Sequence, residues 1–402
     1  MTDKLIVSVS EERHPHAVVR TALARSAGNS AKIWFDISGD VLPPPLAVHD
    51  FAVLAALVVA LREGRPLHIE GAVTETLLRN LEEFQEAWTM WWSRFRPVRV
   101  TADEILQTTE SPTRNGVFAM SGGVDATFAL LRHHSGHAGL RTAHPVCSVM
   151  IHGFDIPLHK QQAFDRARES VLEMTKSFGI PLTTVRTNFR EAVAKNWAME
   201  YFVGVAACLH QFQGLANVAV VGASEDYKQL VWPCASNPVT NHLLSGGGFQ
   251  LHTEGSGFTR TERVRLICDY PEIASKVRVC WEGPVTGANC GRCEKCIRTQ
   301  LNFLANKREP ACFDNKVTHR QILGLTARTP VQIEFLREIV ASARKNGVDE
   351  PWVTMVRLAI AKSRVLRRIR DIETRLRGKP KSPSSTATSL EPGRPEMLGE
   401  RK

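Results

Sequence analysis

The chain has 402 residues, of which 43% are hydrophobic, so it can bury a sizeable core and is not globally disordered. Its 51 lysines and arginines exceed its 41 aspartates and glutamates, giving a formal net charge of +10. No apolar run approaches the roughly 18 residues that a membrane span needs, and the first residues lack the pattern of a signal peptide. We therefore expect a cytoplasmic protein of two or three domains whose cysteines stay reduced.

Most of the positive charge lies in one segment near the C-terminus. Residues 357–381 contain ten basic and two acidic residues, a net charge of +8, whereas residues 382–402 are neutral overall. Residues 1–356 therefore carry a net charge of only +2. Because the bulk of the chain is close to neutral, the total charge does not by itself indicate a nucleic-acid partner.

Residues 1–112 alternate strand-like and helix-like patterns and are predicted to form an N-terminal α/β accessory domain. The expected elements are strands at residues 5–9, 32–36 and 66–70 and helices at residues 51–62 and 74–95. Aromatic residues recur every three or four positions in the second helix, a pattern typical of core packing. No motif in this region carries recognisable chemistry.

Residues 113–312 repeat the strand-then-helix rhythm more clearly. Apolar runs predict strands at residues 116–120, 146–151, 182–185 and 218–222, and helical periodicity predicts helices at residues 126–134 and 161–178. This alternation favours a doubly wound parallel sheet with helices on both faces. In such α/β folds, ligands bind beyond the carboxyl ends of the strands.

The chain after residue 236 is less regular. A short helix is expected over residues 263–267, with Thr261 as its N-cap. Residues 313–377 are predicted to form basic C-terminal helices. Residues 378–402 are rich in proline, serine and threonine and are predicted to be a disordered tail.

The sequence Ser-Gly-Gly-Val-Asp at residues 121–125 follows the first strand of the central region and precedes a helix. Glycines let backbone amides approach a ligand closely, and a helix N-terminus favours phosphate. Asp125 would act through a Mg²⁺ ion that bridges phosphate oxygens. The alternative is a tight turn with an aspartate N-cap in a domain that binds no nucleotide. The sequence is neither a Walker A loop nor a dinucleotide fingerprint.

Four cysteines, Cys280, Cys290, Cys293 and Cys296, have the spacing of a metal site. Two-residue spacers bring successive thiolates to one ion, and four protein ligands leave no open position, so we expect a structural Zn²⁺. An iron–sulfur cluster is the chemical competitor, and four unrelated thiols are the remaining alternative. The other five cysteines lie mostly in apolar patterns and are expected to be buried thiols: Cys147, Cys208, Cys234, Cys268 and Cys312.

Polar residues follow three predicted strands of the central region. Asp155 follows the second strand, Arg186 the third and Asp226 the fourth, and the carboxyl ends of parallel strands converge on the ligand crevice. Arg186 could neutralise the charge of a triphosphate, and Asp226 could contact substrate or metal. Capping or ordinary loop polarity is the alternative for each residue.

The loop at residues 121–125 resembles the Ser-Gly-Gly-x-Asp-Ser/Thr signature of the PP-loop ATP pyrophosphatases. Together with the downstream Cys-Gly-x-Cys-x-x-Cys sequence, it is similar to the QueC-like branch of that superfamily, the 7-cyano-7-deazaguanine synthases. Smaller matches are residues 221–223, the Asp226-Tyr227 pair and residues 259–262. The resemblance covers residues 113–310. Ala126 stands where the signature has serine or threonine, and the family's Ser-Gly-Tyr-Pro-Asp-Cys-Arg run is absent after Tyr227.

The resemblance implies a HUP-like sheet and an enzyme that adenylates a carboxylate or amide oxygen of a small molecule or peptide. Ammonia or another amine then displaces AMP, as in queuosine biosynthesis or a related pathway, including defence-associated ones. ATP and Mg²⁺ would bind at the loop, through Ser121, Gly122, Gly123, Val124, Asp125 and Thr127, and Zn²⁺ at the four cysteines. The residues expected to act in catalysis are Asp125, Asp226 and Arg186.

Two other functions fit the same motifs. A PP-loop tRNA-modifying sulfurtransferase would use a reactive cysteine pair or an iron–sulfur cluster. A partner subunit that binds a nucleotide but no longer catalyses a reaction is the second alternative. It would be consistent with Ala126, which lacks the hydroxyl of the signature.

The basic C-terminal segment is expected to form a helix that docks through one apolar face. Its apolar positions are Val365, Ile369, Ile372 and Leu376, and the face would bind the body of the protein or a second copy in a homodimer. Nucleic-acid binding by this helix is less favoured, because no aromatic residues interleave with the charges. Partner proteins could also bind through the N-terminal domain.

Overall fold

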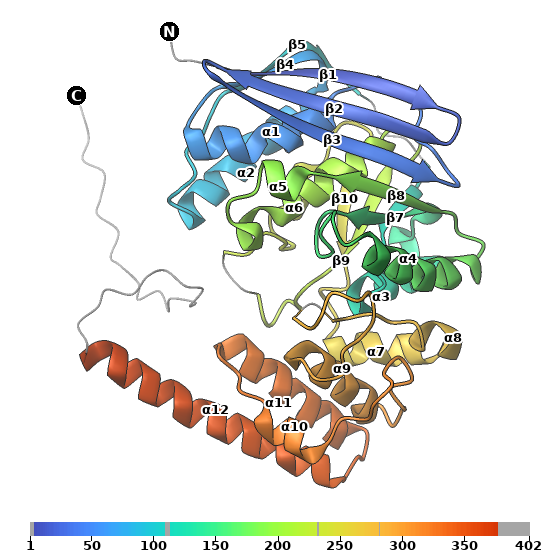
Figure 1. Ribbon diagram of the computed structural model, residues 1–402, viewed down its shortest axis with the longest axis vertical. Coiled ribbons are helices and arrows are strands. Elements are labelled where there is room, and N and C mark those ends of the chain that lie inside the picture. The colour runs from blue at the N-terminus through green and yellow to red at the C-terminus, as the bar shows by residue number, and fades with distance from the viewer. Residues whose placement is uncertain (1–3, 109–112, 231–232, 281, 377–402) are drawn as a thin grey trace.

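The computed structural model describes residues 4–108, 113–230, 233–280 and 282–376. Its strands are β1 (Leu5–His14), β2 (Ala17–Ser26), β3 (Asn29–Gly39), β4 (Leu67–Thr74), β5 (Val100–Leu106), β6 (Asn115–Ala119), β7 (His144–His152), β8 (Leu182–Thr187), β9 (Val218–Gly222) and β10 (Gln250–Glu254). They form a ten-stranded sheet in the order β10-β9-β6-β7-β8-β3-β2-β1-β4-β5 (Figure 1).

Helices surround this sheet and form a separate group at one end of the molecule (Figure 1). The helices are α1 (Asp50–Glu63), α2 (Glu75–Trp91), α3 (Val124–His134), α4 (Gln161–Lys176), α5 (Phe189–Ala192), α6 (Trp197–Leu209), α7 (Arg260–Cys268), α8 (Pro271–Ala274), α9 (Glu294–Ala305), α10 (His319–Gly324), α11 (Pro330–Lys345) and α12 (Pro351–Leu376). Among the described residues, no helix is both long and apolar enough to span a membrane.

The sheet consists of two parallel parts joined by antiparallel strands. β10, β9, β6, β7 and β8 all run parallel, as do β1, β4 and β5. Between them, β3 pairs antiparallel with both β8 and β2, and β2 pairs antiparallel with β1. The fold is therefore α/β with a mostly parallel sheet, and it is consistent with a Rossmann-like architecture.

The region expected to be a separate N-terminal domain shares this sheet with the central region. β3 pairs with β8 over five residues, from Phe35 opposite Thr187 to Gly39 opposite Thr183. One hydrophobic core also contains buried residues from both regions. The expected boundary at residue 112 lies outside the described residues. Hydrophobic periodicity locates individual strands, but it does not reveal which edges will pair, so the sequence did not show that both regions contribute to one sheet.

Local sequence explains the limits of several elements. α1 is apolar around most of its circumference because it is buried between the sheet and α6, and it ends where Gly64 takes a left-handed conformation with φ 65°. β2, β5 and β10 were not expected from the sequence. The alternation of apolar and polar residues in β2 is interrupted by Arg20, which occupies an inward-facing position and is 1% exposed. It pairs there with Glu11 at 2.7 Å.

The sequence predicted Thr261 as the N-cap of the short helix, two residues later than the N-cap in the structure, Thr259. The helix, α7, begins at Arg260, and the Thr259 side chain accepts a hydrogen bond from the Glu262 backbone N–H. The Glu262 carboxylate accepts one from the Thr259 N–H in return, which completes a capping box. Thr261 is the second residue of the helix and is buried, and its hydroxyl lies 2.9 Å from Asn302 and Glu338.

The expected C-terminal helices form a cluster with its own core. α9, α10, α11 and α12 pack around buried residues that include Leu301, Leu336 and Val356. The first half of α12 belongs to this core, but Val365, Ile369 and Ile372 in its second half are exposed. The expected docking of these three residues on the body of the protein is therefore wrong. The expected disordered tail lies outside the described residues, as does the side chain of Leu376.

A buried carboxylate fixes the C-terminal end of α3 to the edge strand β10. Glu254 is 3% exposed, and its oxygens lie 3.0 Å from Arg132, 3.1 Å from Arg141 and 3.4 Å from His133. Burial alone would raise the pKa of Glu254, but the hydrogen bond from His133 and the charges of Arg141 and Arg132 outweigh it. The pKa of Glu254 is therefore held below its usual value.

We expect Glu254→Gln to lower the free energy of unfolding by about 3 kcal/mol at pH 7, because the substitution leaves the largely buried Arg132 without its counter-charge. Urea denaturation measures this difference. It should shrink as the pH falls through the lowered pKa, since Glu254 then becomes protonated in the native state. Glu83→Gln, at an exposed position of α2, is the control and should change little. Equal stability of wild type and Glu254→Gln at pH 7 would contradict this account.

Candidate functional site

The Ser121–Asp125 turn joins the end of β6 to the start of α3, as the sequence predicted. Gly122 has φ 74°, a conformation that residues with a side chain rarely adopt, and its carbonyl accepts a hydrogen bond from the Arg278 N–H at 2.8 Å. Gly123 is the N-cap of α3. The first amides of α3 are therefore next to the turn, at the carboxyl end of a central parallel strand.

A small cavity of about 70 Å³ opens at this turn. The turn and α3 contribute Ser121, Gly123, Asp125 and Ala126. The rest of the wall comes from segments that are distant in the sequence: Asp155, Arg260, Arg278, Val279, Cys280 and Lys295. The cavity therefore lies between the sheet and the helices that follow it, and its charged wall residues include three cations and two carboxylates.

Two arginines of α7 hold the Asp125 carboxylate. Arg263 lies 2.7 Å from one oxygen and Arg260 lies 2.9 Å from the other. Burial alone would raise the pKa of Asp125, but the positive charges of Arg260, Arg263 and Lys295 outweigh it and lower that pKa. Asp125 is therefore ionised at neutral pH, and it neutralises part of a strongly positive site.

Arg278 and Lys295 complete the positive charge of the cavity. Burial lowers the pKa of Lys295, the nearby charge of Arg260 lowers it further, and Asp125 and Asp155 oppose both effects. Burial also lowers the pKa of Arg278, against the attraction of Asp155. Clustered cations in a partly desolvated cavity beside a helix N-terminus attract an anion such as a phosphate. Sequence reasoning did not identify these residues as a site, although Arg260 lies in the matched residues 259–262 and Lys295 inside the cysteine motif.

Two of the expected catalytic residues do not line this cavity. Arg186 pairs instead with Asp36 of the neighbouring strand β3, at 3.3 Å. Asp226 is buried, and its carboxylate accepts a hydrogen bond from the Lys228 N–H at 2.9 Å, as a turn-capping aspartate does. The sequence placed both residues at strand ends but could not reveal these local partners.

Three of the expected nucleotide-binding residues also do not line the cavity: Gly122, Val124 and Thr127. Val124 is the first residue of α3, and its side chain is fully buried in the core. Thr127 is 1% exposed, and its hydroxyl has no hydrogen-bond partner among the described residues. Thr127 is therefore not positioned to replace the hydroxyl that Ala126 lacks.

A further carboxylate, Glu225, lies in the same electrostatic environment. It follows β9, which pairs with β6, so both strand ends lie at the same edge of the sheet. Burial raises the pKa of Glu225 to about 7, and the negative charge of Asp125 adds to this effect while Arg263 and Arg260 oppose it. This carboxyl group therefore titrates near neutral pH beside the cavity.

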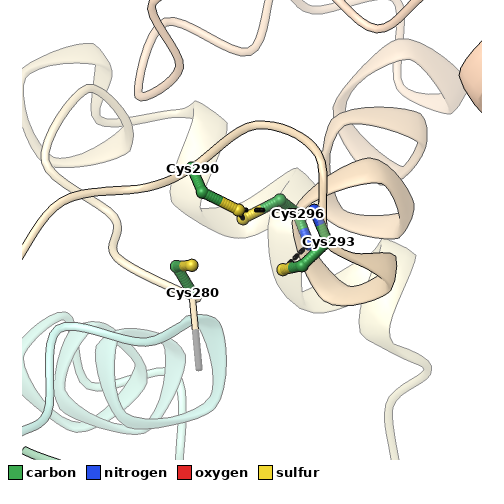
Figure 2. Close-up of side chains that lie close together, drawn as sticks. All are labelled: Cys280, Cys290, Cys293 and Cys296. Atoms are coloured by element: carbon green, nitrogen blue, oxygen red, sulfur yellow. Dashed lines mark hydrogen bonds between the residues drawn. The ribbon is translucent and has the colours of Figure 1, made fainter. Parts of the chain in front are cut away.

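The four expected metal ligands come together in space (Figure 2). The sulfur atoms of Cys280, Cys290, Cys293 and Cys296 all lie within 4.8 Å of one another. The Cys290 sulfur accepts a hydrogen bond from the Cys293 N–H at 3.3 Å, and the Cys293 sulfur accepts one from the Cys296 N–H at 3.4 Å. Such N–H groups stabilise negative charge on sulfur, and this cluster could hold a metal ion such as zinc.

The cysteine cluster and the cationic cavity share chain segments. Cys293 is the N-cap of α9, so Lys295 lies in the first turn of the helix that carries two of the ligands. Cys280 itself lines the cavity. A metal ion that joins Cys280 to α9 would therefore also fix two parts of the cavity wall relative to each other.

The other cysteines are protonated thiols. Burial raises the pKa of Cys147, Cys234 and Cys268 to about 11 and that of Cys312 to about 12. Burial also raises the pKa of Cys208 well above its usual value. None of these five residues has the lowered pKa of a reactive cysteine. Cys147, Cys208 and Cys268 are buried as expected, whereas Cys234 and Cys312 are only partly buried.

Comparison with known proteins adds no family to this description. No protein-family model matches the chain, and a search of curated proteins finds no match. An α/β sheet of this kind supports many unrelated functions, so a function has to be argued from the residues of the site.

We expect the wild-type protein to contain about one zinc ion per chain and Cys290→Ser to lose it, because three remaining thiolates bind zinc less tightly. Elemental analysis of the purified proteins measures this content. Cys312→Ser changes a nearby thiol outside the cluster and should keep the metal. A coloured wild-type protein that contains iron and sulfide would instead identify an iron–sulfur cluster.

Proposed function

We propose that this protein is a QueC-like, ATP-dependent enzyme that activates a carboxylate or amide oxygen and transfers ammonia or another amine to the activated carbon. The observation that carries this proposal is the cationic cavity at the Ser121–Asp125 turn, at a helix N-terminus and a strand end. The same cavity adjoins a four-cysteine cluster. The order of the two motifs in the chain supports the QueC-like class rather than another nucleotide-binding class.

The residues of the cavity suit the charge changes of adenylation. Backbone N–H groups of the turn and the side chains of Arg260, Arg278 and Lys295 would bind phosphate oxygens and stabilise the departing pyrophosphate. Asp125 and Asp155 would hold Mg²⁺, which neutralises phosphate charge when it is bound. Arg260 would then move from Asp125 to the phosphates, because both groups compete for its guanidinium.

The proposed reaction has two steps. The substrate oxygen attacks the α-phosphorus of ATP and pyrophosphate leaves. The amine then attacks the activated carbon, AMP leaves with the transferred oxygen, and the amine gives up a proton. Positioning and charge neutralisation provide most of the rate enhancement in such a reaction, which suits a site built mainly from cations and backbone amides.

Zinc on the four cysteines would have a structural role in this enzyme. Four thiolates leave no coordination position for a substrate, so the metal would hold Cys280 and α9 together rather than act as a Lewis acid. Loss of the metal would then weaken nucleotide binding indirectly, through the position of Lys295.

Of the alternatives, a nucleotide-binding subunit without turnover has a specific observation in its favour. Ala126 lines the cavity without a hydroxyl, and the neighbouring Thr127 hydroxyl is buried behind it. A sulfurtransferase has less support, because burial raises the pKa of every cysteine outside the metal cluster.

The direct test is to incubate the full-length protein with ATP, Mg²⁺, ammonium and 7-carboxy-7-deazaguanine and to measure AMP and pyrophosphate. We expect the wild type to release both products. Arg260→Ala and Lys295→Ala should lower the rate by about 10²-fold or more, because each removes a charge at the phosphates. Arg265→Ala, an exposed position of α7, is the matched control and should keep the wild-type rate.

The outcomes distinguish the alternatives. Nucleotide binding without AMP formation would favour the partner subunit or a different substrate. Failure to bind ATP at all, in a folded protein that contains its metal, would overturn the proposal.

We expect Gly222→Ala to weaken ATP binding by about tenfold or more, measured by calorimetry. A Cβ atom at this position would lie 2.3 Å from the backbone of Asp125, so the turn would have to move. Gly257→Ala is the matched control, because a Cβ there meets no atom within 4 Å. Equal ATP affinity of Gly222→Ala and wild type would show that the position of this turn does not matter for binding.

A further inference from the structure

α12 has two apolar faces, and the described chain covers only one of them. Trp352, Val356 and Ile360 are buried in the helical cluster. On the opposite side, four apolar residues remain about half exposed: Leu358 at 52%, Val365 at 56%, Ile369 at 47% and Ile372 at 55%. The second half of the helix extends beyond α10 and α11 (Figure 1).

The spacing of the exposed residues is that of a helix–helix seam. Leu358, Val365, Ile369 and Ile372 follow one another at intervals of seven, four and three residues, the a and d positions of a heptad. At 100° per residue they form one stripe, about 180° from the buried face of α12. Isolated helices of a few turns are marginally stable in water, so an exposed apolar stripe on the end of a helix indicates a missing partner.

A basic groove lies on the flank of α12, between its buried face and this stripe. It lies between α11 and α12, has a volume of about 620 Å³ and a floor of small and branched apolar side chains. Its rim carries five cations and no acid: Arg337, Arg344, Lys345, Arg357 and Arg364. Only Arg337 has an ion pair with a described residue, Glu334. The groove is therefore both apolar and strongly positive.

We propose that this groove and the adjoining stripe of α12, the C-terminal docking surface, bind an acidic amphipathic helix of a partner protein. Apolar side chains of that helix would pack on Leu358, Val365 and Ile369, and its carboxylates would pair with Arg357 and Arg364. Buried apolar contacts supply affinity in this arrangement, and the charges select the partner and its orientation. The inference does not depend on the activity proposed for the cavity.

Charge and surface chemistry favour this occupant over two others. A second copy of the chain would place a second set of arginines against the first, and like charges oppose such a dimer. A nucleic acid would pair with the cations but would leave the apolar floor and stripe without apolar contacts. No aromatic residue lines the groove for base stacking. An acidic helix with an apolar face satisfies both components of the surface.

The test uses the full chain and a labelled synthetic peptide of about three heptads, with leucine at a and d and glutamate at e and g. Fluorescence anisotropy should show binding that weakens as salt screens the charges. We expect the pair Arg357→Glu and Arg364→Glu to weaken binding by about tenfold or more. The pair Val365→Ser and Ile369→Ser should do the same. All four positions are exposed, so the variants should keep the fold, which circular dichroism checks.

A matched charge reversal tests specificity. The pair Lys4→Glu and Arg99→Glu changes exposed cations next to β1 and β5, at the other end of the molecule, and should not affect binding. The same peptide with lysine at e and g should not bind.

Several outcomes would overturn the proposal. These are no binding of the acidic peptide, equal binding of the lysine peptide, and equal binding by the Arg357 and Arg364 variant. A dimer mass in light scattering that Val365→Ser and Ile369→Ser abolish would identify a second copy as the occupant. Binding of a duplex RNA oligonucleotide, lost on reversal of Arg357 and Arg364 while the peptide does not bind, would identify nucleic acid.

Discussion

The ion pairs between Asp125 and two arginines of α7 connect the two halves of this molecule. Asp125 lies in the first turn of α3, which packs on the sheet, whereas Arg260 and Arg263 begin the helical group. α7 in turn contacts α9, which carries two of the clustered cysteines, and α11 through the Thr261–Glu338 hydrogen bond. These ion pairs therefore link the strand-end turn to the helical group, together with the hydrophobic core that α3, α7 and α9 share.

Positive charge is concentrated at two places with different surroundings. In the cavity, Arg260, Arg278 and Lys295 lie close to Asp125 and Asp155, so each cation is partly compensated and held in position. On the C-terminal docking surface the cations surround an apolar floor, and only Arg337 has an ion pair with a described residue. The first arrangement suits a small, multiply charged ligand that leaves after reaction. The second suits a protein surface of opposite charge.

The first hundred residues do not line the cavity, but they continue the sheet at whose strand ends the cavity lies. β3 closes the edge of the parallel strands at β8, and α1 packs against α6 beneath the same strands. Arg186, which the sequence placed at the ligand, is held by Asp36 of β3 as part of this junction. An exposed edge at β8 would leave its backbone groups unpaired, and the antiparallel addition removes that edge.

The sequence by itself determined the strand–turn–helix at Ser121–Asp125, the four clustered cysteines and most of the helices and strands, because these depend on local periodicity and spacing. It did not determine that β3 pairs with β8, or that Arg186 and Asp226 bind local partners instead of lining the cavity. Nor did it determine that the cations of the cavity wall gather around Asp125. It also assigned the second apolar face of α12 to packing on the body or on a second copy, and within the described chain that face is exposed. Strand pairing and ion pairs between distant segments depend on which surfaces come into contact in the folded chain. A local sequence pattern carries no information about those contacts.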